Sequence, residues 1–226
     1  MSRRPDYRYP QGRILVFAKP PIAGEVKTRL AARIGSPAAT ALYAQLVRET
    51  VGMAVSAGLA AVELHVASQP QHPFFRSLAD GPALPIALQQ GSNLGERMCN
   101  ALRAVLRSAD FAVLIRADCP AITSAYLRKA CEFLDSGKTV VLGPAEDGGY
   151  VLIGVRALEQ SLFTAIPWGS DRVLQLTRTR LRALQLSYAE LETLWDIDRF
   201  EDLRRWQRKR RAAPIPREFG NGVSEE

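Results

Sequence analysis

Residues 111–120 read FAVLIRADCP, and this stretch decides the fold class. Its first five residues, Phe111–Ile115, form a continuous apolar run of strand length. Such a run, without the alternation of a half-exposed strand, is typical of a strand buried on both faces of a parallel sheet. The residues from about 123 to 134 predict a helix directly after it. A buried strand followed by a helix is the repeating unit of an α/β fold.

The same alternation of strand-length and helix-length segments continues on both sides of this stretch. Further strands are predicted at residues 14–18, 62–67, 84–88, 139–142 and 150–155, and helices at 36–57, 94–106, about 171–183 and about 200–211. In the longest helix, Ser36 is expected at the N-cap and Gly58 just beyond the end. The pattern predicts a three-layer α/β/α sandwich around a mainly parallel sheet. We expect one domain over residues 12–211, with mobile tails at 1–11 and 212–226.

Composition narrows the class of protein. Hydrophobic residues make up 47% of the 226 residues and charged residues 23%, as in ordinary globular proteins, which excludes wholesale disorder. The sequence contains no run of about 18 apolar residues that could span a membrane, and no signal-like segment near its start. We therefore expect a cytoplasmic protein without a membrane span.

Cysteine and histidine are scarce. The three cysteines form no C-x-x-C pair, which argues against a disulfide framework or a structural zinc site, and there are only two histidines. A Ser-His-Asp hydrolase is therefore disfavoured, and acid–base or metal chemistry would depend on carboxylates. No histidine lies near Cys119 in the sequence, so this thiol is expected to be a buried bystander.

The net charge of +7 is unevenly distributed. Residues 172–211 carry eleven Arg and Lys against six Asp and Glu, and residues 204–211 read RRWQRKRR. A basic run of this kind can bind nucleic acid or an anionic membrane surface. Because Trp206 is the one aromatic residue within it, a solvated helix face is the favoured interpretation and a nucleic-acid partner the disfavoured one.

The stretch KPPIAGEVKTRL begins at Lys19, directly after the first predicted strand. Its two prolines and Gly24 shape a loop, and Lys27 and Arg29 add two more cations near it. A helix is expected to start at about Glu25, and free N–H groups at a helix start together with cations suit phosphate. The spacing is not that of a Walker A loop, and a plain surface connection is the alternative.

Two aspartates follow predicted strands. Asp118 comes just after the apolar run and could hold Mg²⁺ against nucleotide phosphates, because Mg²⁺ often takes only one or two carboxylates. The alternative is an N-cap for the following helix. Asp147 begins an Asp-Gly-Gly sequence, which is a hairpin signal in its own right. Glu146 and Asp147 are nevertheless expected at the same sheet edge as Asp118, where the glycines allow close ligand approach.

The late segment WDIDRFED contains Asp196 and Asp198, which face the same side if the backbone is extended. One or both could complete a metal site, whereas Asp198 could instead cap the last helix. Two glycine-containing turns at residues 90–97 and 166–171 precede further helices and carry weaker signals.

Six segments together resemble a known family. They are, in chain order, FAKPPIAGEVKTRLAARIG, QQGSNLGERM, RADCPAI, GPAEDGGYVLIG, IPWGSDRV and LWDIDRFEDL. This series is similar to the bacterial glycosyltransferase-like family related to phospholactate guanylyltransferase, within the nucleotide-diphospho-sugar transferase superfamily. The resemblance covers about residues 13–203 and implies an α/β fold of the glycosyltransferase-A type.

The resemblance also implies roles for residues. The basic loop would wrap the nucleotide phosphates through Lys19, Gly24, Lys27, Thr28 and Arg29. Asp118 and Asp198 would hold Mg²⁺ or Mn²⁺. The chain departs from the family pattern where Arg199 and Phe200 replace the usual Thr-Pro, and where Arg116 replaces a small residue.

These features together predict a Mg²⁺-dependent transferase. It would move a glycosyl or nucleotidyl group from a nucleotide sugar or nucleoside triphosphate to a small acceptor. Lys19, Lys27 and Arg29 would neutralise the leaving group, and Asp147 would contact the acceptor or act as a base, so that catalysis is positioning plus electrostatics. The alternatives are a non-catalytic nucleotide sensor and a binder of nucleic acid or anionic surfaces through the basic C-terminal helix.

Overall fold

The computed structural model describes residues 6–78 and 84–212. Its strands are β1 (Gly12–Ala18), β2 (Ala61–Val66), β3 (Ile86–Leu88), β4 (Phe111–Arg116), β5 (Val140–Pro144), β6 (Tyr150–Val155) and β7 (Tyr188–Glu190). They form a seven-stranded sheet in the order β3-β2-β1-β4-β6-β5-β7. Strand β6 runs antiparallel to β4 and β5, and the other neighbouring strands are parallel. The expected mainly parallel sheet is confirmed.

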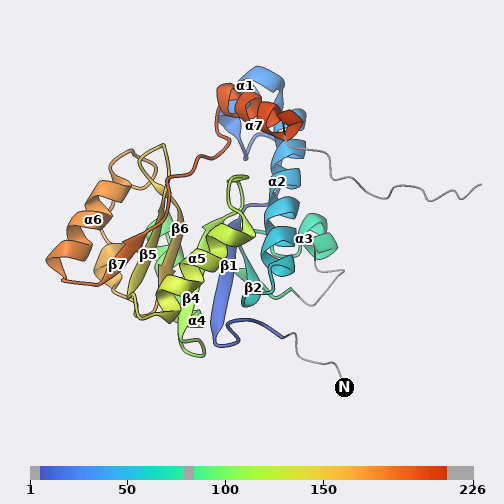
Figure 1. Cartoon of the computed structure of the whole chain (residues 1–226). Helices are drawn as coiled ribbons and strands as arrows, with labels where there is room; N and C mark the ends of the chain where they lie inside the picture. The colour runs from blue at the N-terminus through green and yellow to red at the C-terminus, as the bar shows by residue number, and fades with distance from the viewer. Residues whose placement is uncertain (1–5, 79–83, 213–226) are drawn as a thin grey trace, which may run out of the picture.

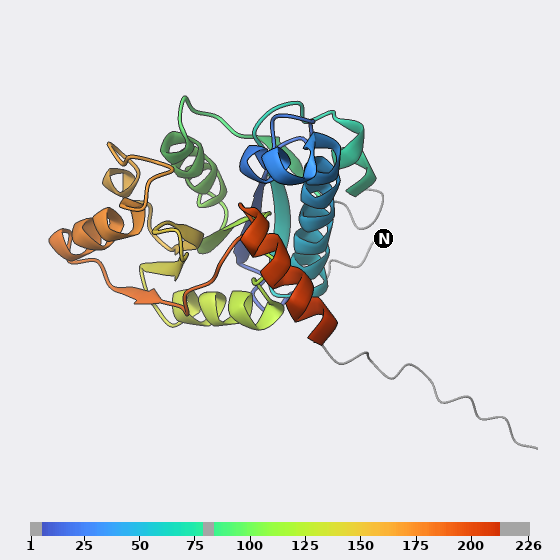
Figure 2. The ribbon, with the colours of Figure 1, turned by 90° about the horizontal axis from the view of Figure 1, so that it is seen from above.

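Helices cover both faces of the sheet (Figures 1 and 2). They are α1 (Thr28–Ile34), α2 (Ser36–Ser56), α3 (Pro73–Leu78), α4 (Leu94–Val105), α5 (Ser124–Asp135), the 3-10 turn η1 (Gln160–Leu162), α6 (Val173–Ala183) and α7 (Phe200–Ala212). One core cluster joins α2, α3 and α5 to Ile14 and Val16 of β1, and another joins α4 and α6 to Leu15 and Phe17. Alternate residues of one strand thus enter opposite cores, which confirms the three-layer α/β/α sandwich. None of the described helices is long and apolar enough to cross a bilayer.

A third, smaller core packs α7 and the segment before it against α1 and α2. Leu30 of α1, Leu46 of α2 and Leu203 of α7 pack together with Trp195 and Ile197. Figure 1 shows α1 and α7 side by side at one end of α2. This cluster holds the segment before α7 against the residues that follow β4.

The structure corrects two predicted helix starts. Helix α1 begins at Thr28 rather than at about Glu25, because Lys27 adopts a left-handed conformation with φ 49° that interrupts the helix. Residues 24–27 therefore remain a loop. Helix α2 begins at Ser36, so Gly35 occupies the expected cap position and the Ser36 side chain does not cap the helix. Gly58 follows the end of α2 with φ 61°, as predicted.

The expected N-terminal tail is shorter than residues 1–11. Tyr9 is buried in the core, and its backbone N–H donates to the carbonyl oxygen of Leu59 at 2.7 Å. Residues 1–5 and 213–226 lie outside the described part of the chain. The short elements α3 and β7 were not predicted.

Candidate active site

A cavity of about 640 Å³ opens where β1 and β4 end. All six segments singled out in the sequence contribute to its wall. They do so through Lys27, Arg97, Asp118, Asp147, Trp168 and Asp198, among other residues. Ligands of α/β sheets bind beyond the carboxyl ends of the strands, so the cavity has the location expected for a functional site.

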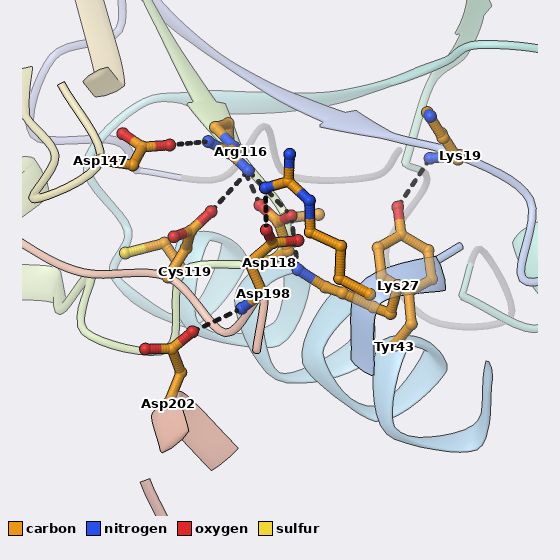
Figure 3. A network of polar contacts seen from close by, with 12 residues as sticks. Lys19, Lys27, Tyr43, Arg116, Asp118, Cys119, Asp147, Asp198 and Asp202 are labelled. Carbon is orange, nitrogen blue, oxygen red and sulfur yellow. Dashed lines mark hydrogen bonds and ion pairs between the residues drawn. The ribbon is translucent and has the colours of Figure 1, made fainter. Parts of the chain in front are cut away.

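Asp118 lies at the centre of a network of charges (Figure 3). Its carboxylate accepts hydrogen bonds from Lys27 Nζ at 2.8 Å and from Arg116 Nε and Nη2 at 3.0 and 3.1 Å. Burial raises the pKa of Asp118, but the charges of Arg116 and Lys27 outweigh burial and hold this pKa well below its usual range. Asp118 does not cap the next helix, because Thr123 does so by accepting from the Tyr126 N–H at 3.2 Å. The N-cap alternative for Asp118 is thereby excluded.

The loop after β1 directs Lys27 inward. The Lys27 side chain is 4% exposed, and its left-handed backbone costs about 1 kcal/mol or more for a residue other than glycine. In this conformation Lys27 Nζ forms its ion pair with Asp118 at 2.8 Å. At the start of the loop, the Lys19 N–H donates to the hydroxyl of Tyr43 at 2.8 Å. Lys19, Thr28 and Arg29 also line the cavity.

The segment before α7 docks directly onto the residues after β4. The Cys119 thiol donates to the carbonyl oxygen of Trp195 at 3.1 Å, and the Ile197 N–H donates to the carbonyl oxygen of Asp118 at 3.4 Å. Burial raises the pKa of Cys119 to about 12, in agreement with a bystander thiol. Docking of this segment places Asp196 and Asp198 in the wall of the same cavity.

The two late aspartates have different partners. Asp196, 10% exposed, accepts from Arg116 Nη2 at 2.6 Å, whereas Asp198, 38% exposed, accepts from Arg29 Nη1 at 2.7 Å. Burial raises the pKa of Asp196, although the charge of Arg116 opposes the shift. Among the described residues the Asp198 carboxylate accepts from Arg29 and from no backbone N–H, so it does not cap α7, whereas Asp202 accepts from the backbone N–H groups of residues 198 and 199.

Asp147 belongs to a tight hairpin between β5 and β6, as its Asp-Gly-Gly signal predicted. Gly148 has φ 83°, and a Cβ there would collide with the Asp171 carbonyl, so only glycine fits. The Asp147 carboxylate accepts from the Gly149 N–H at 2.9 Å and lies 3.9 Å from Arg116 Nη1. Asp147 therefore reaches the network from the side opposite the basic loop.

The carboxylates of this cavity are suitable ligands for a divalent cation. Hard oxygen donors are preferred by Mg²⁺ and accepted by Mn²⁺. Within residues 6–78 and 84–212, no three acidic, His or Cys side chains are grouped as a ready metal site. Asp118, Asp196 and Asp198 nevertheless line the same cavity, and the guanidinium of Arg116 already bridges the first two. The donor set thus fits a cation held by one or two carboxylates, with phosphate oxygens as its remaining ligands.

Intramolecular contacts occupy much of the basic face of α7. Arg205 bonds to both carboxylate oxygens of Glu146 and lies 4.5 Å above the Trp195 ring. Arg210 pairs with Glu49 and lies over Trp206. Stacking on aromatic rings and pairing with carboxylates give these arginines a structural role.

Sequence reasoning did not single out two tyrosines of the cavity. The Tyr43 hydroxyl anchors the basic loop, as described above. Tyr150, 8% exposed, also lines the cavity, and its hydroxyl has no hydrogen-bond partner among the described residues. Its position at the end of the Asp-Gly-Gly turn was visible in the sequence, but its burial was not.

Comparison with solved structures defines the class of fold. A Desulfovibrio desulfuricans G20 protein assigned to the nucleotide-diphospho-sugar transferases is 31% identical, with a TM-score of 0.83 over 92% of this chain and 91% of that chain. CMP:2-keto-3-deoxy-manno-octonic acid synthetase complexed with CTP is 10% identical, with a TM-score of 0.57 over 89% and 98%. Rv0371c from Mycobacterium tuberculosis H37Rv in complex with manganese is 16% identical, with a TM-score of 0.54 over 86% and 97%. The fold is that of the nucleotide-diphospho-sugar transferases, as the six segments implied.

Residues 50–170 match the family described as "Uncharacterized protein conserved in bacteria" (DUF2064), and the chain belongs to this family. Proteins with curated functions include no significant sequence match. The residues of the cavity are therefore the basis for a functional assignment.

Proposed function

We propose that this protein is a divalent-metal-dependent transferase. It would move a nucleotidyl or glycosyl group from a nucleoside triphosphate or nucleotide sugar to a small acceptor. The observation that carries this proposal is the meeting of a partly buried carboxylate, Asp118, with the cations of the basic loop in one cavity at the strand ends. The fold shared with the CTP-bound synthetase supports a nucleotide as the donor.

The basic loop would bind the phosphates of the donor. Lys19 and Arg29 are exposed at the cavity wall, whereas Lys27 points inward to Asp118. Fixed cations stabilise charge that develops on a departing pyrophosphate or nucleoside diphosphate without reorganising during the reaction. Thr28 lines the cavity, whereas Gly24, with φ 86°, lies in the same loop outside the lining and would allow the loop to bend toward the phosphates. These residues would thus bind the donor and stabilise its leaving group.

We assign the metal to Asp118 and Asp198. The pair between Asp198 and Arg29 is partly exposed, with the Arg29 side chain 65% accessible, so exchanging it for another partner costs little. Asp196 is more buried and holds Arg116 at 2.6 Å, which suits a positioning role better. A bound Mg²⁺ or Mn²⁺ would neutralise phosphate oxygens as a Lewis acid.

The acceptor would approach from the hairpin side of the cavity. Asp147 lies there and would orient the acceptor or take its proton. Trp168 packs against Tyr150 with ring centroids 6.2 Å apart and forms the adjacent wall. Exclusion of water by this wall would favour transfer to the acceptor over hydrolysis.

Thermal unfolding with Mg²⁺ and a panel of nucleotides tests ligand binding directly. A nucleotide at 100 times its dissociation constant adds about 2.7 kcal/mol to the free energy of unfolding, which raises the melting temperature visibly. We expect a Mg²⁺-dependent shift with one class of nucleoside triphosphate or nucleotide sugar. The absence of any shift at millimolar concentrations would contradict a nucleotide donor.

Product analysis then separates the possible reactions. Nucleotidyl transfer releases pyrophosphate, glycosyl transfer releases a nucleoside diphosphate, and a nucleotide sensor releases neither. The double variant Asp118→Ala/Asp198→Ala is expected to lose metal-dependent turnover while keeping its circular dichroism spectrum. Retained turnover in this variant would refute the assignment of the metal residues.

A further inference from the structure

Arg116 occupies both carboxylate oxygens of Asp118, the atoms that a metal ion bound there would also use. Its guanidinium contacts both carboxylate oxygens of Asp118, at 3.0 and 3.1 Å, and its Nη2 also contacts Asp196 at 2.6 Å. Its Nη1 lies 3.9 Å from Asp147 (Figure 3). One guanidinium thus connects three carboxylates that come from three separate parts of the chain. A metal ion at Asp118 competes with it for the same oxygens.

The arrangement leaves Arg116 free to change partners. Its side chain is 37% exposed, so it is not enclosed by the core. The contacts of Asp196 and Asp147 with Arg116 are separate from its contact with Asp118, and both aspartates line the cavity. Loss of the contact with Asp118 therefore leaves Arg116 with an anionic anchor instead of a buried, unpartnered charge.

Local charge balance disfavours a metal ion that arrives alone. Four carboxylates (Asp118, Asp147, Asp196 and Asp198) face three cations (Arg116, Lys27 and Arg29), so the network carries a net charge of about −1. A divalent ion would make this network positive in a partly buried place, where like charges repel strongly. A metal ion that brings anionic phosphates with it gives the released Arg116 and Lys27 a new partner.

We propose that Arg116 is a resident cation that occupies the metal position at Asp118 in the free protein. Metal binds there in competition with Arg116, and the phosphates of the donor then take over the released guanidinium. Arg116 thereby couples metal binding to donor binding and opposes occupation of the site by metal alone. This inference rests on the proposed function, because it takes Asp118 to be a metal ligand.

The test is a titration of the protein with Mn²⁺ in the absence of nucleotide. The electron paramagnetic resonance signal of free Mn²⁺ reports how much of the ion remains unbound. We compare the unsubstituted protein with Arg116→Gln and Arg116→Ala, and the glutamine variant serves if the alanine variant does not fold. Arg178→Ala is the matched control, since Arg178 also makes two bonds to one carboxylate, that of Glu190, and is 35% exposed. Asp118→Asn, alone and combined with Arg116→Gln, shows whether Mn²⁺ is bound at Asp118.

We expect Arg116→Gln to bind Mn²⁺ about tenfold more tightly than the unsubstituted protein, within the range usual for coupled ligands. Adding Asp118→Asn should abolish this gain, and Arg178→Ala should change nothing. Equal or weaker Mn²⁺ binding in the Arg116 variants, with loss in Asp118→Asn, would overturn the role of Arg116 and leave the metal site standing. Tighter Mn²⁺ binding that persists when Asp118→Asn is added would place the metal away from Asp118 and would also overturn the role of Arg116. Absence of Mn²⁺ binding in every variant, with or without nucleoside triphosphate, would refute the metal site and the inference together.

Discussion

Two arginine–carboxylate pairs of this protein have nearly the same geometry and different surroundings. Arg116 makes two hydrogen bonds to Asp118, and Arg178 makes two to Glu190. The arginine side chains are similarly exposed, at 37% and 35%. The carboxylates differ, because Asp118 also holds buried Lys27 and faces the cavity, whereas Glu190 simply fastens β7 to α6. The geometry of a pair alone therefore does not distinguish the two; the convergence of distant segments on Asp118 is what supports the proposed site there.

Neutralising each carboxylate is the strongest test of this contrast. Asp118→Asn leaves the buried Lys27 ammonium without its carboxylate partner, and breaking a buried ion pair by removing one member costs about 3–5 kcal/mol. Glu190→Gln breaks a more exposed pair and should cost about 1 kcal/mol or less. Urea unfolding at pH 7 measures both values, and turnover should be lost in Asp118→Asn alone. Equal losses of stability would show that the two sites do not differ in kind.

Removing the second cation of the network separates catalysis from packing. Lys27→Met keeps the length of the buried side chain but removes its charge. We expect kcat to fall by about 10²–10³, the usual effect of deleting one preorganised electrostatic contact. Lys209→Met is the control, because Lys209 packs over Trp195 outside the cavity wall. A similar fall in kcat for Lys209→Met would argue against a specific role for Lys27.

Acid should erase the stability that Asp118 contributes. Its pKa is lowered in the folded protein, so its contribution is complete above the unfolded value of about 3.9 and is lost as the pH falls below it. The gap in unfolding free energy between the unsubstituted protein and Asp118→Asn should therefore narrow between about pH 5 and pH 3. The pKa of Asp196 is raised by burial, so its protonation acts in the opposite direction and adds stability on acidification.

Urea unfolding at several pH values measures this gap. The pKa of Glu190 is also lowered, first by its hydrogen bond from Arg178, so Glu190→Gln should show the same trend with a smaller amplitude. A gap for Asp118→Asn that does not change with pH would contradict a lowered pKa in the folded protein.

Arg29 tests the exposed side of the cavity. Its pair with Asp198 is largely solvated, so Arg29→Ala should change the free energy of unfolding by about 1 kcal/mol or less. The same substitution removes a cation assigned to the donor phosphates, and we expect the KM for the donor to rise about tenfold with a smaller effect on kcat. Steady-state kinetics with varied donor concentration measures the two effects. An unchanged KM would exclude Arg29 from donor binding.

Much of the fold and the composition of the site could be predicted from the sequence. Long apolar runs such as Phe111–Ile115 and amphipathic helices such as Leu94–Val105 carry a period that local reasoning detects. The segments after the strands were predicted to meet at one sheet edge, and the structure brings Asp118, Asp147 and Asp198 to one cavity. Because parallel strands end at the same edge of a sheet, the segments that follow β4 and β5 are expected to meet there.

The features that were missed depend on contacts between distant residues. Lys27 interrupts the helix with a left-handed backbone, and its side chain bonds to Asp118, 91 positions later in the sequence. Asp196 and Asp198 have the same local pattern, and their different partners follow from how their segment docks on Cys119. Strand β7 has three residues and forms by pairing with β5, so it has no period to detect.

Tyr150 gives the smallest expected effect and tests a different part of the cavity wall. Burial raises the pKa of this tyrosine, so its hydroxyl stays protonated, yet it has no partner among the described residues. An unsatisfied buried hydroxyl carries a desolvation cost of about 1–3 kcal/mol, so Tyr150→Phe should leave the ligand-free protein equally stable or stabilise it by about 1 kcal/mol. If the acceptor supplies the missing hydrogen bond, the same variant loses affinity for acceptor while its stability holds. A clear loss of stability in the ligand-free variant would mean that the hydroxyl already has a partner in solution, and Tyr150 would then belong with Glu190 among the structural contacts.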